Sequence, residues 1–323
     1  MNRKPFRAVI LLVLALLIHR FAQAAADLTP INLVSAGSGG IVEMIKFSQK
    51  YGFFKKQGLD MTIIFVNSGV LTAQTVVSGS APIANNTITD VLHAIAAGAP
   101  LKILTVNIDH FQHLFVARAG INSPKDMKGK KVAVSRYGAF SDIETRFLIR
   151  QWGLDPDKDV QVLQIGNSGA RSAALLSGAV DGAVVTPSFV PAARKAGLNV
   201  IFDLSSMKAK FANIGLMANE QFIREQPRLA RAAVAGLIQG IKYWKTNPEI
   251  AKGYLREIHK VSSADIDAIY EDVNKNVRSE PTPDLDGIQA AWESVPDLKA
   301  RGPVDFRKFV EPRFVEEALR EMK

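Results

Sequence analysis

The chain has 323 residues, a formal net charge of +9, 47% hydrophobic residues and no cysteine. The lack of cysteine excludes disulfides, thiol nucleophiles, cysteine-ligated metals and a lipid-modified N-terminal cysteine. A chain of this length can bury a large core without such links, and its size suggests two domains. The basic residues are scattered, with Lys128–Lys131 as the one tight cluster, so we expect no nucleic-acid partner.

Residues 1–26 are predicted to be a signal peptide. Three basic residues among the first seven precede Ala8–Ile18, an uninterrupted apolar run of 11 residues. A transmembrane helix needs about 20 apolar residues, so this run is too short to span a bilayer, and an uncleaved N-terminal anchor is the alternative. Cleavage after Ala24 or Ala26 fits equally well. We therefore expect the mature protein to be soluble and periplasmic.

The following segment repeats its own pattern at an offset of 99 or 100 residues. Each copy reads strand, polar loop, helix, strand, polar loop, helix, strand. Helical stretches such as Ile41–Tyr51 and Ile143–Trp152 alternate with short β-branched strands, which predicts parallel α/β units. The matching positions are Val34-Ser35 with Val134-Ser135, Asn67-Ser68-Gly69 with Asn167-Ser168-Gly169, Ser78-Gly79 with Ser177-Gly178, and the polar strand ends Asn85-Asn86-Thr87 with Thr186.

The chain beyond Asn219 predicts long helices with apolar stripes, one beginning near Pro227 and another near Ser262. Two strand-like runs, Leu114–Ala117 and Ile214–Ala218, are predicted to cross between two lobes. The expected lobes are residues 27–116 plus 217–323, and residues 117–216.

Several segments carry a family resemblance that extends over about residues 31–220. They resemble the nitrate/sulfonate/taurine-type solute-binding proteins of ABC transporters, which share a fold with thiamin-pyrimidine-precursor-binding proteins. The matching segments are Phe47–Leu59, Gly98–Lys102, Ile121–Val134 and Leu176–Asp181. One departure is Ser80, at a position where the family often has an acidic residue; the second copy keeps Asp181.

The resemblance implies an α/β, two-lobed periplasmic-binding-protein fold of type II-like topology. Each lobe would be a mixed or parallel sheet flanked by helices, with two crossing strands as the hinge. In open α/β sheets ligands bind outside the carboxyl ends of the strands. If the lobes face each other, the polar loops at the strand ends line one cleft.

The first ligand loop is predicted over residues 35–40, with Ser35, Gly37 and Ser38 as candidates. Glycine lets backbone N–H groups approach a ligand, and the N-terminus of the next helix favours an anion or a carbonyl oxygen. A flexible turn is the alternative.

The resemblance places the second ligand loop over residues 135–142. Arg136 could clamp a carboxylate, sulfonate or phosphate, and Tyr137 or Phe140 could stack on a flat ring. Alternatively, Arg136 is simply solvated and Ser141 or Asp142 caps the next helix. The candidates in this loop are Ser135, Arg136, Tyr137, Gly138 and Ser141.

Neutral polar groups at the other strand ends complete the predicted site. Amides and hydroxyls orient a solute without the cost of desolvating a buried charge. Asn67 could instead start a turn. The candidates are Asn67, Asn85, Asn86, Thr87 and Thr186.

These features predict the solute-binding component of an ABC importer, with a permease and its ATPase as partners and a monomeric state. The ligand would be a small organic or anionic solute: a sulfonate, taurine, nitrate or a pyrimidine-like molecule. We expect no catalysis, metal or cofactor, because the mature histidines have no HExxH frame and no G-x-S-x-G elbow occurs. The alternatives are a ligand-sensing module without transport and an enzyme like the thiamin-pyrimidine synthases. Those enzymes rely on a cysteine-rich motif that this chain lacks. In the enzyme case His110 or His113 would act.

Overall fold

The computed structural model describes residues 28–36, 40–66, 68–207 and 210–322. The predicted signal peptide lies outside these ranges, as do Gly37, Ser38 and Asn67 of the predicted site. None of the helices within these ranges is long and apolar enough to cross a membrane.

Two five-stranded mixed sheets form the framework, which confirms the predicted α/β class. The first sheet has the strand order β2-β1-β3-β10-β4. Within it, β1 is parallel to β2 and β3, whereas β10 is antiparallel to β3 and β4. Its strands are β1 (Thr29–Ala36), β2 (Leu59–Val66), β3 (Ile83–Thr87), β4 (Leu101–Ile103) and β10 (Ile214–Asn219).

The second sheet repeats this arrangement strand for strand, with the order β7-β6-β8-β5-β9. Here β6 is parallel to β7 and β8, and β5 is antiparallel to β8 and β9. The repeat seen in the sequence therefore pairs β1 with β6 and β3 with β8. The strands are β5 (Leu114–Ala117), β6 (Lys131–Val134), β7 (Gln161–Gln164), β8 (Gly182–Val185) and β9 (Asn199–Asp203).

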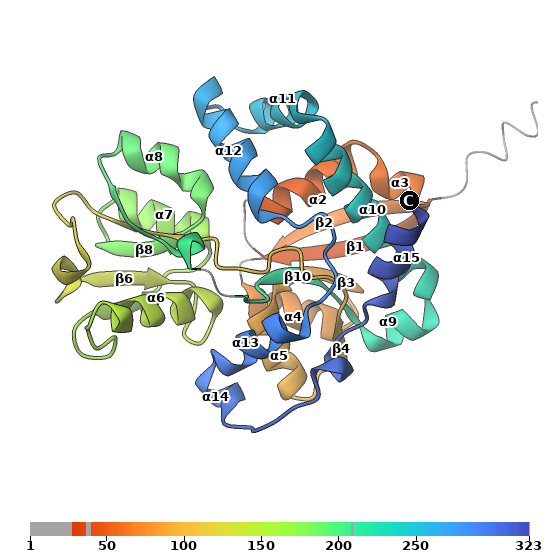
Figure 1. Cartoon of the computed structure of the whole chain (residues 1–323), viewed down its shortest axis with the longest axis horizontal. Coiled ribbons are helices and arrows are strands. Elements are labelled where there is room, and N and C mark those ends of the chain that lie inside the picture. The colour runs from red at the N-terminus through yellow and green to blue at the C-terminus, as the bar shows by residue number, and fades with distance from the viewer. Residues whose placement is uncertain (1–27, 37–39, 67, 208–209, 323) are drawn as a thin grey trace, which may run out of the picture.

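We call the first sheet with its helices the first lobe, and the second sheet with its helices the second lobe (Figure 1). The helices of the second lobe are α6 (Phe140–Gln151), α7 (Ser168–Leu176) and α8 (Val190–Lys195). The first lobe takes α2 (Gly40–Lys50), α3 (Phe53–Lys56), α4 (Gly69–Val77) and α5 (Ile88–Ala96) from its own half of the repeat. The tail adds α9 (Glu220–Glu225), α10 (Pro227–Thr246), α11 (Pro248–Ile258), α12 (Ser263–Asn276), α13 (Leu285–Glu293), α14 (Pro296–Lys299) and α15 (Arg313–Glu321).

The chain passes between the lobes twice, over residues 104–113 and again between β9 and β10. The two passages lie side by side, since the Asn213 N–H donates to the Ile108 carbonyl at 2.9 Å. The runs predicted to cross, Leu114–Ala117 and Ile214–Ala218, are the strands β5 and β10, and each pairs inside one sheet. The residues that cross between the lobes precede β5 and β10 in the chain. These two strands do not cross, because their backbone N–H and C=O groups are hydrogen-bonded to neighbouring strands of one sheet. The lobe limits remain a prediction.

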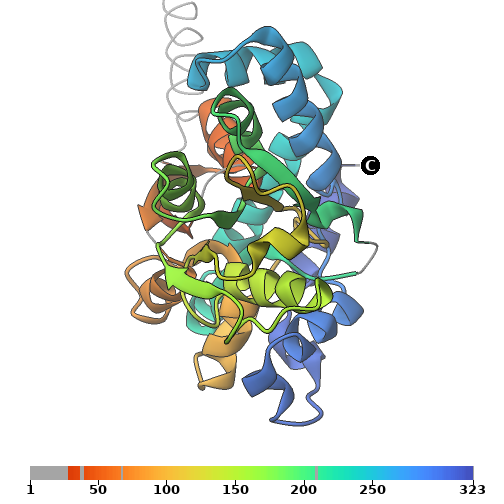
Figure 2. The ribbon, with the colours of Figure 1, turned by 90° about the vertical axis from the view of Figure 1, so that its left-hand side faces the viewer.

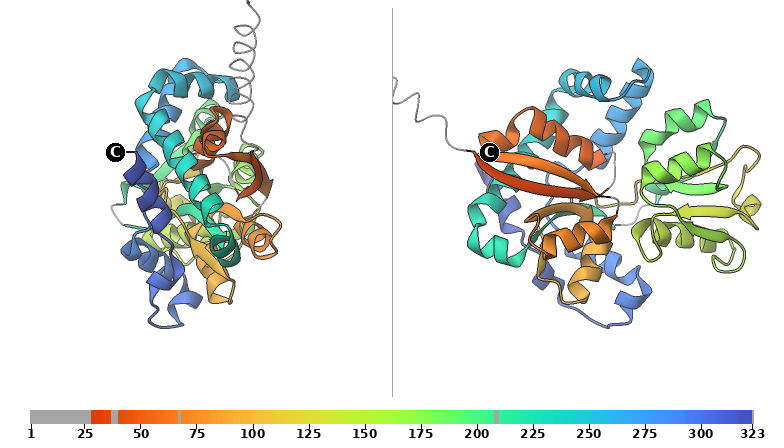
Figure 3. Two further views of the ribbon diagram at one scale, coloured as in Figure 1. Left: turned by 90° about the vertical axis from the view of Figure 1, so that its right-hand side faces the viewer. Right: turned by 180° about the vertical axis from the view of Figure 1, so that it is seen from behind.

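The tail helices cover the first lobe, with α11 and α12 extending on one side and α13 and α14 on the other (Figures 1 and 2). Helix α10 packs against α2, α3 and α15 (Figure 3). Trp244 of α10 is fully buried and makes edge-on contacts with Phe47 and Tyr254. The aromatic stripe of the tail is therefore core.

A second hydrophobic cluster continues through the hinge, because it contains Val34 of the first sheet and Val132 of the second. Phe111 and Phe211, one from each crossing, stack with ring centroids 4.5 Å apart. Phe140 at the start of α6 lies 5.7 Å from Phe111 and 5.4 Å from Phe211. The lobes thus share an aromatic contact beside the crossings.

Candidate ligand-binding site

A cavity of about 110 Å³ lies between the lobes, at the carboxyl ends of β1, β3, β6 and β8. Both lobes and the first crossing contribute to it. Its described lining is Ala36, Ile41, Val42, Ser68, Gly69, Asn85, Asn86, Thr87, Asp90, Gln112, His113, Ser135, Ala139, Phe140, Ser141, Asn167, Ser168, Arg171, Thr186 and Ile214.

Five helices point their N-termini at this cavity. The first turns of α2, α4 and α5 reach it from the first lobe, and those of α6 and α7 from the second. Each helix N-terminus has unpaired N–H groups and a partial positive charge, so it attracts anions. The convergence follows from the parallel α/β connections, which place every strand end and the next helix start on one edge.

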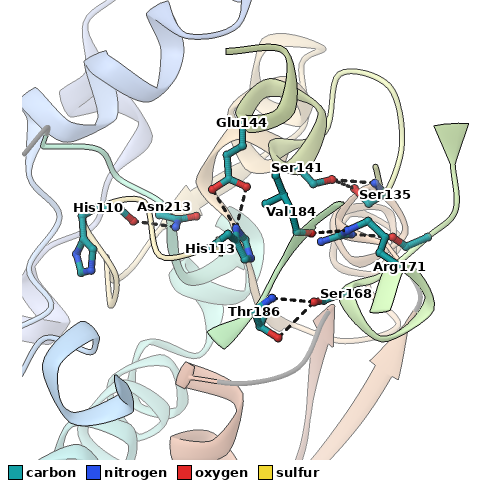
Figure 4. Close-up of polar contacts among 11 residues, drawn as sticks. His110, His113, Ser135, Ser141, Glu144, Ser168, Arg171, Val184, Thr186 and Asn213 are labelled. Carbon is teal, nitrogen blue, oxygen red and sulfur yellow. Dashed lines mark hydrogen bonds and ion pairs between the residues drawn. The ribbon is translucent and has the colours of Figure 1, made fainter. Parts of the chain in front are cut away.

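Arg171 of α7 brings a full positive charge to the same place (Figure 4). The residue is only 4% exposed, and its Nε and Nη1 donate to the carbonyls of Val184 and Gly166, each at 2.8 Å. Burial lowers the pKa of Arg171 to about 10, while the nearby Glu144 carboxylate acts to raise it. At neutral pH the guanidinium is therefore still charged.

Hydroxyl groups of the second lobe line the same cavity as this cation. The Ser135 N–H donates to Ser141 Oγ at 2.8 Å, and the two hydroxyl oxygens are also 2.8 Å apart. The Thr186 N–H donates to Ser168 Oγ at 3.1 Å (Figure 4). Hydroxyls can rotate to donate to a ligand, so this wall suits an oxyanion.

A buried hydrogen-bonded pair, His113 and Glu144, lies at the edge of the cavity, between the first crossing and α6. His113 Nδ1 is 2.8 Å and 3.0 Å from the two carboxylate oxygens of Glu144 (Figure 4). Glu144 is fully buried, and His113 is 8% exposed and lines the cavity. Because Nδ1 is held by Glu144, the other ring nitrogen is the one left for the cavity.

The wall from the first lobe is made of amides and one carboxyl group. Asn86 Nδ2 donates to the Gly69 carbonyl at 2.8 Å, and Thr87 Oγ1 donates to Asp90 Oδ2 at 2.6 Å. Burial raises the pKa of Asp90, against the lowering effects of the Thr87 hydrogen bond, His93 and Arg136. A carboxyl group held this way accepts a proton more readily than a solvated one.

The cavity brings together six of the predicted ligand residues. Ser35 is not among them, because it is fully buried beneath the lining, where its Oγ accepts from Asn85 Nδ2 at 3.1 Å. The six are Asn85, Asn86, Thr87, Ser135, Ser141 and Thr186. Their contact with a ligand stays a prediction.

Arg136, Tyr137 and Gly138 are exposed and do not belong to the described lining, which departs from the prediction. The Tyr137 hydroxyl donates to the Val162 carbonyl at 3.0 Å, and the residue is 55% exposed. Gly138 turns the loop with a φ of 76° that favours glycine. This turn and the Tyr137 bond hold the loop tip against β7.

The charged lining residues Arg171 and Asp90 were not predicted from the sequence, and His113 was named only for the enzyme alternative, without its partner Glu144. One local signal existed for Arg171. It lies in the first turn of α7, where the helix dipole disfavours a basic residue. An arginine at this position therefore indicates a role other than stabilising the helix. Ser168 belonged to the repeated Asn-Ser-Gly motif and could have been chosen from it.

The comparisons with known proteins agree with this architecture. The profile of the NMT1/THI5-like family matches residues 44–251. A Brucella abortus (strain 2308) protein, named a putative binding protein, is 23% identical over 277 residues, covering 84% of this chain and 85% of its own.

Two solved structures show the range of proteins with this fold. The alkanesulfonate-binding protein SsuA from Xanthomonas axonopodis pv. citri, bound to MOPS, has a TM-score of 0.71 at 14% identity, covering 91% of this chain and 99% of its own. The desulfurization enzyme DSZB has a TM-score of 0.64 at 15% identity, covering 90% of this chain and all of its own. At these identities the likeness concerns the fold alone.

Proposed function

The chain belongs to the NMT1/THI5-like family, and from this premise we propose that it is the solute-binding protein of an ABC importer. It traps a small anionic solute between its two lobes, residues 27–116 plus 217–323 and residues 117–216. The protein is exported by its signal peptide, works as a periplasmic monomer and presents the closed complex to the permease and its ATPase. The names of structural neighbours, such as the alkanesulfonate-binding protein, support this role.

One observation carries the proposal: five helix N-termini and the buried Arg171 meet at a single cavity lined from both lobes. Burying a cation is costly, and within the part of the chain that the structure describes Arg171 donates only to neutral carbonyls, with the Glu144 carboxylate near it but not among its hydrogen-bond partners. An anionic guest would pair directly with the guanidinium and accept from the Ser141 and Ser168 hydroxyls. We therefore assign sulfonates and carboxylates as the substrate class, of a size that suits a cavity of about 110 Å³.

Contacts on both lobes also explain why binding would close the molecule. A ligand shifts an equilibrium only by its difference in affinity between two states. A solute held by Arg171 and Ser141 on one side and by Asn85 and Thr87 on the other binds the closed form better. The paired crossings are the natural hinge.

The test is calorimetric titration of the mature protein with small sulfonates, carboxylates, nitrate and pyrimidines, combined with small-angle scattering. We expect saturable binding of an anion with compaction. Arg171→Met removes the buried charge and should weaken binding by about 10- to 100-fold. Arg194→Met, an exposed arginine of the same lobe, is the matched control and should bind normally. Binding of neutral solutes only, or no binding to any of the panel, would contradict the proposal.

The His113–Glu144 pair is the observation that favours a second function, an enzyme. A carboxylate that orients an imidazole is the arrangement used for general-base catalysis. Within the described residues, however, His113 is hydrogen-bonded to Glu144 and to no hydroxyl nucleophile. We therefore expect a bound solute to be recovered chemically unchanged after prolonged incubation. Mass spectrometry of the released solute measures this, and a new product would favour the enzyme.

A further inference from the structure

We propose that His113 couples anion binding to proton uptake, so that the cavity takes up an anion and a proton together. This inference rests on the proposed function and assigns its specificity to one side chain. In this scheme Glu144 orients the imidazole, and the ring nitrogen Nε2 receives the proton that faces the anion.

The geometry determines which ring nitrogen meets the ligand. Both carboxylate oxygens of Glu144 lie within 3.0 Å of His113 Nδ1, so this nitrogen carries a hydrogen that it donates. In a neutral imidazole the other nitrogen, Nε2, is then an acceptor with a lone pair. An anion in the cavity would meet that lone pair and be repelled. With a proton on Nε2 the same nitrogen becomes a charged donor to the anion.

The charges around the His113 ring are such that this one proton changes the net charge of the cavity. Glu144 from α6 is fully buried, and among the described residues its hydrogen-bond partner is His113. Arg171 from α7 brings one positive charge, which Glu144 offsets. Asp90 from α5 lies on the opposite wall, and Arg136 acts on it from the loop above. A protonated His113 therefore changes the fixed charge of the cavity from balanced to positive.

Asp90 is the rival source of proton uptake. Its burial already raises its pKa, and an incoming anion would raise it further. The experiment must therefore separate these two groups. A sulfonate is the right probe, because its own charge is constant over the pH range in which imidazoles and buried carboxylates titrate.

The measurement is calorimetric titration with ethanesulfonate and larger alkanesulfonates in buffers of different ionisation enthalpy, from pH 5.5 to 8.5. We expect up to about one proton taken up per sulfonate bound, and an affinity that falls by up to about tenfold per pH unit on the alkaline side. His113→Gln should abolish most of this uptake and flatten the pH dependence. Asp90→Asn should keep the uptake.

His110→Gln is the matched control, since His110 lies in the same crossing but outside the cavity lining. It should retain both the proton uptake and the pH dependence. Sulfonate binding without proton uptake, or uptake that survives in His113→Gln, overturns the inference and leaves the proposed function standing. Absence of binding by every anion tested contradicts the proposed function, and the inference falls with it.

A second readout covers the case in which His113→Gln fails to fold. In the unaltered protein, nuclear magnetic resonance follows each histidine ring through its titration with and without the sulfonate. The midpoint for His113 should rise on binding, and Glu144→Gln should diminish that rise because the ring loses its orienting carboxylate. A midpoint unchanged by a bound sulfonate overturns the inference.

Discussion

Arg171 illustrates how single residues of this site combine structural and functional tasks. Two of its nitrogens hold main-chain carbonyls of its own lobe, at Val184 and Gly166. These bonds fix the guanidinium before any ligand arrives, so little side-chain freedom is lost on binding. The same logic applies to Asn85 and Asn86, which are held by Ser35 and Gly69. Hydrogen bonds behind the cavity wall therefore fix the side chains of Arg171, Asn85 and Asn86 before a ligand binds.

Asp272 of α12 gives a prediction about pH at the scale of one residue. Burial raises its pKa from 3.8 to about 6, against the lowering effect of the Asn276 hydrogen bond. The folded state therefore holds this proton more tightly than the unfolded chain, and stability falls as pH rises from about 4 to about 6. Asp272→Asn should be more stable than the native protein by about 1–3 kcal/mol at pH 7.5, and equally stable near pH 4.

Urea unfolding at both pH values measures this difference. Asp272 Oδ1 accepts a hydrogen bond from Asn276 Nδ2 at 2.8 Å, and the amide oxygen introduced by Asp272→Asn could accept the same bond, so the local geometry is kept. The control is Glu271→Gln, an exposed carboxyl group on the same helix. A variant that is less stable than the native protein at pH 7.5 would show that the carboxylate is favourable where it lies.

At the scale of elements, the helices that reach the cavity are positioned by close packing behind them. Gly240 of α10 faces Ser48 of α2, and a Cβ added at Gly240 would lie 1.8 Å from Ser48 Oγ. Ser48 itself is tied to the Met44 carbonyl at 2.7 Å. The two helix axes can therefore approach only because residue 240 has no side chain, and α2 owes its position to that contact.

Gly240→Ala should destabilise the protein by about 1–3 kcal/mol, since the added methyl group forces α2 and α10 apart. Thermal or denaturant unfolding measures it. Gly253→Ala is a matched control, because its Cβ would meet nothing within 4 Å inside helix α11. There the better helix propensity of alanine should add up to about 1 kcal/mol. Equal effects of the two substitutions would refute the close-packing argument.

At the scale of the whole molecule, the two lobes are joined by a continuous core as well as by two crossings. Phe211 contacts Phe111 and Phe140, and the cluster to which they belong contains residues of both sheets. A shared core makes neighbouring units unfold together. The same contact limits how freely the lobes turn about the hinge.

Phe211→Ala should cost about 3–5 kcal/mol and separate the unfolding of the lobes into two transitions. Scanning calorimetry detects this, because the calorimetric enthalpy then exceeds the van't Hoff value. Phe65→Ala is the control, since Phe65 is 47% exposed at the edge of the first sheet. A single sharp transition in Phe211→Ala would mean that the crossings alone couple the lobes.

Local patterns predicted much of this molecule. The alternation of helices and β-branched strands, the repeat and the helical tail all follow from residues close together in the chain. The polar strand ends Asn85–Thr87 and Ser135 were found for the same reason, because a turn after an apolar run is visible in sequence. The crossings were predicted at Leu114–Ala117 and Ile214–Ala218, a few residues C-terminal to where the chain passes between the lobes. The sequence does not distinguish the two cases, because an apolar run has the same pattern in a crossing as in a sheet.

By itself, the sequence determined the α/β class, the doubled unit and the edge at which polar loops gather, because hydrophobic periodicity and turn residues act over a few positions. Only the tertiary structure decided which charges share the cavity. Glu144 and His113 are 31 positions apart, and Arg171 is hidden inside a helical pattern. Pairing between distant charges depends on how the two lobes are packed, and local patterns of hydrophobic and turn residues carry no information about it.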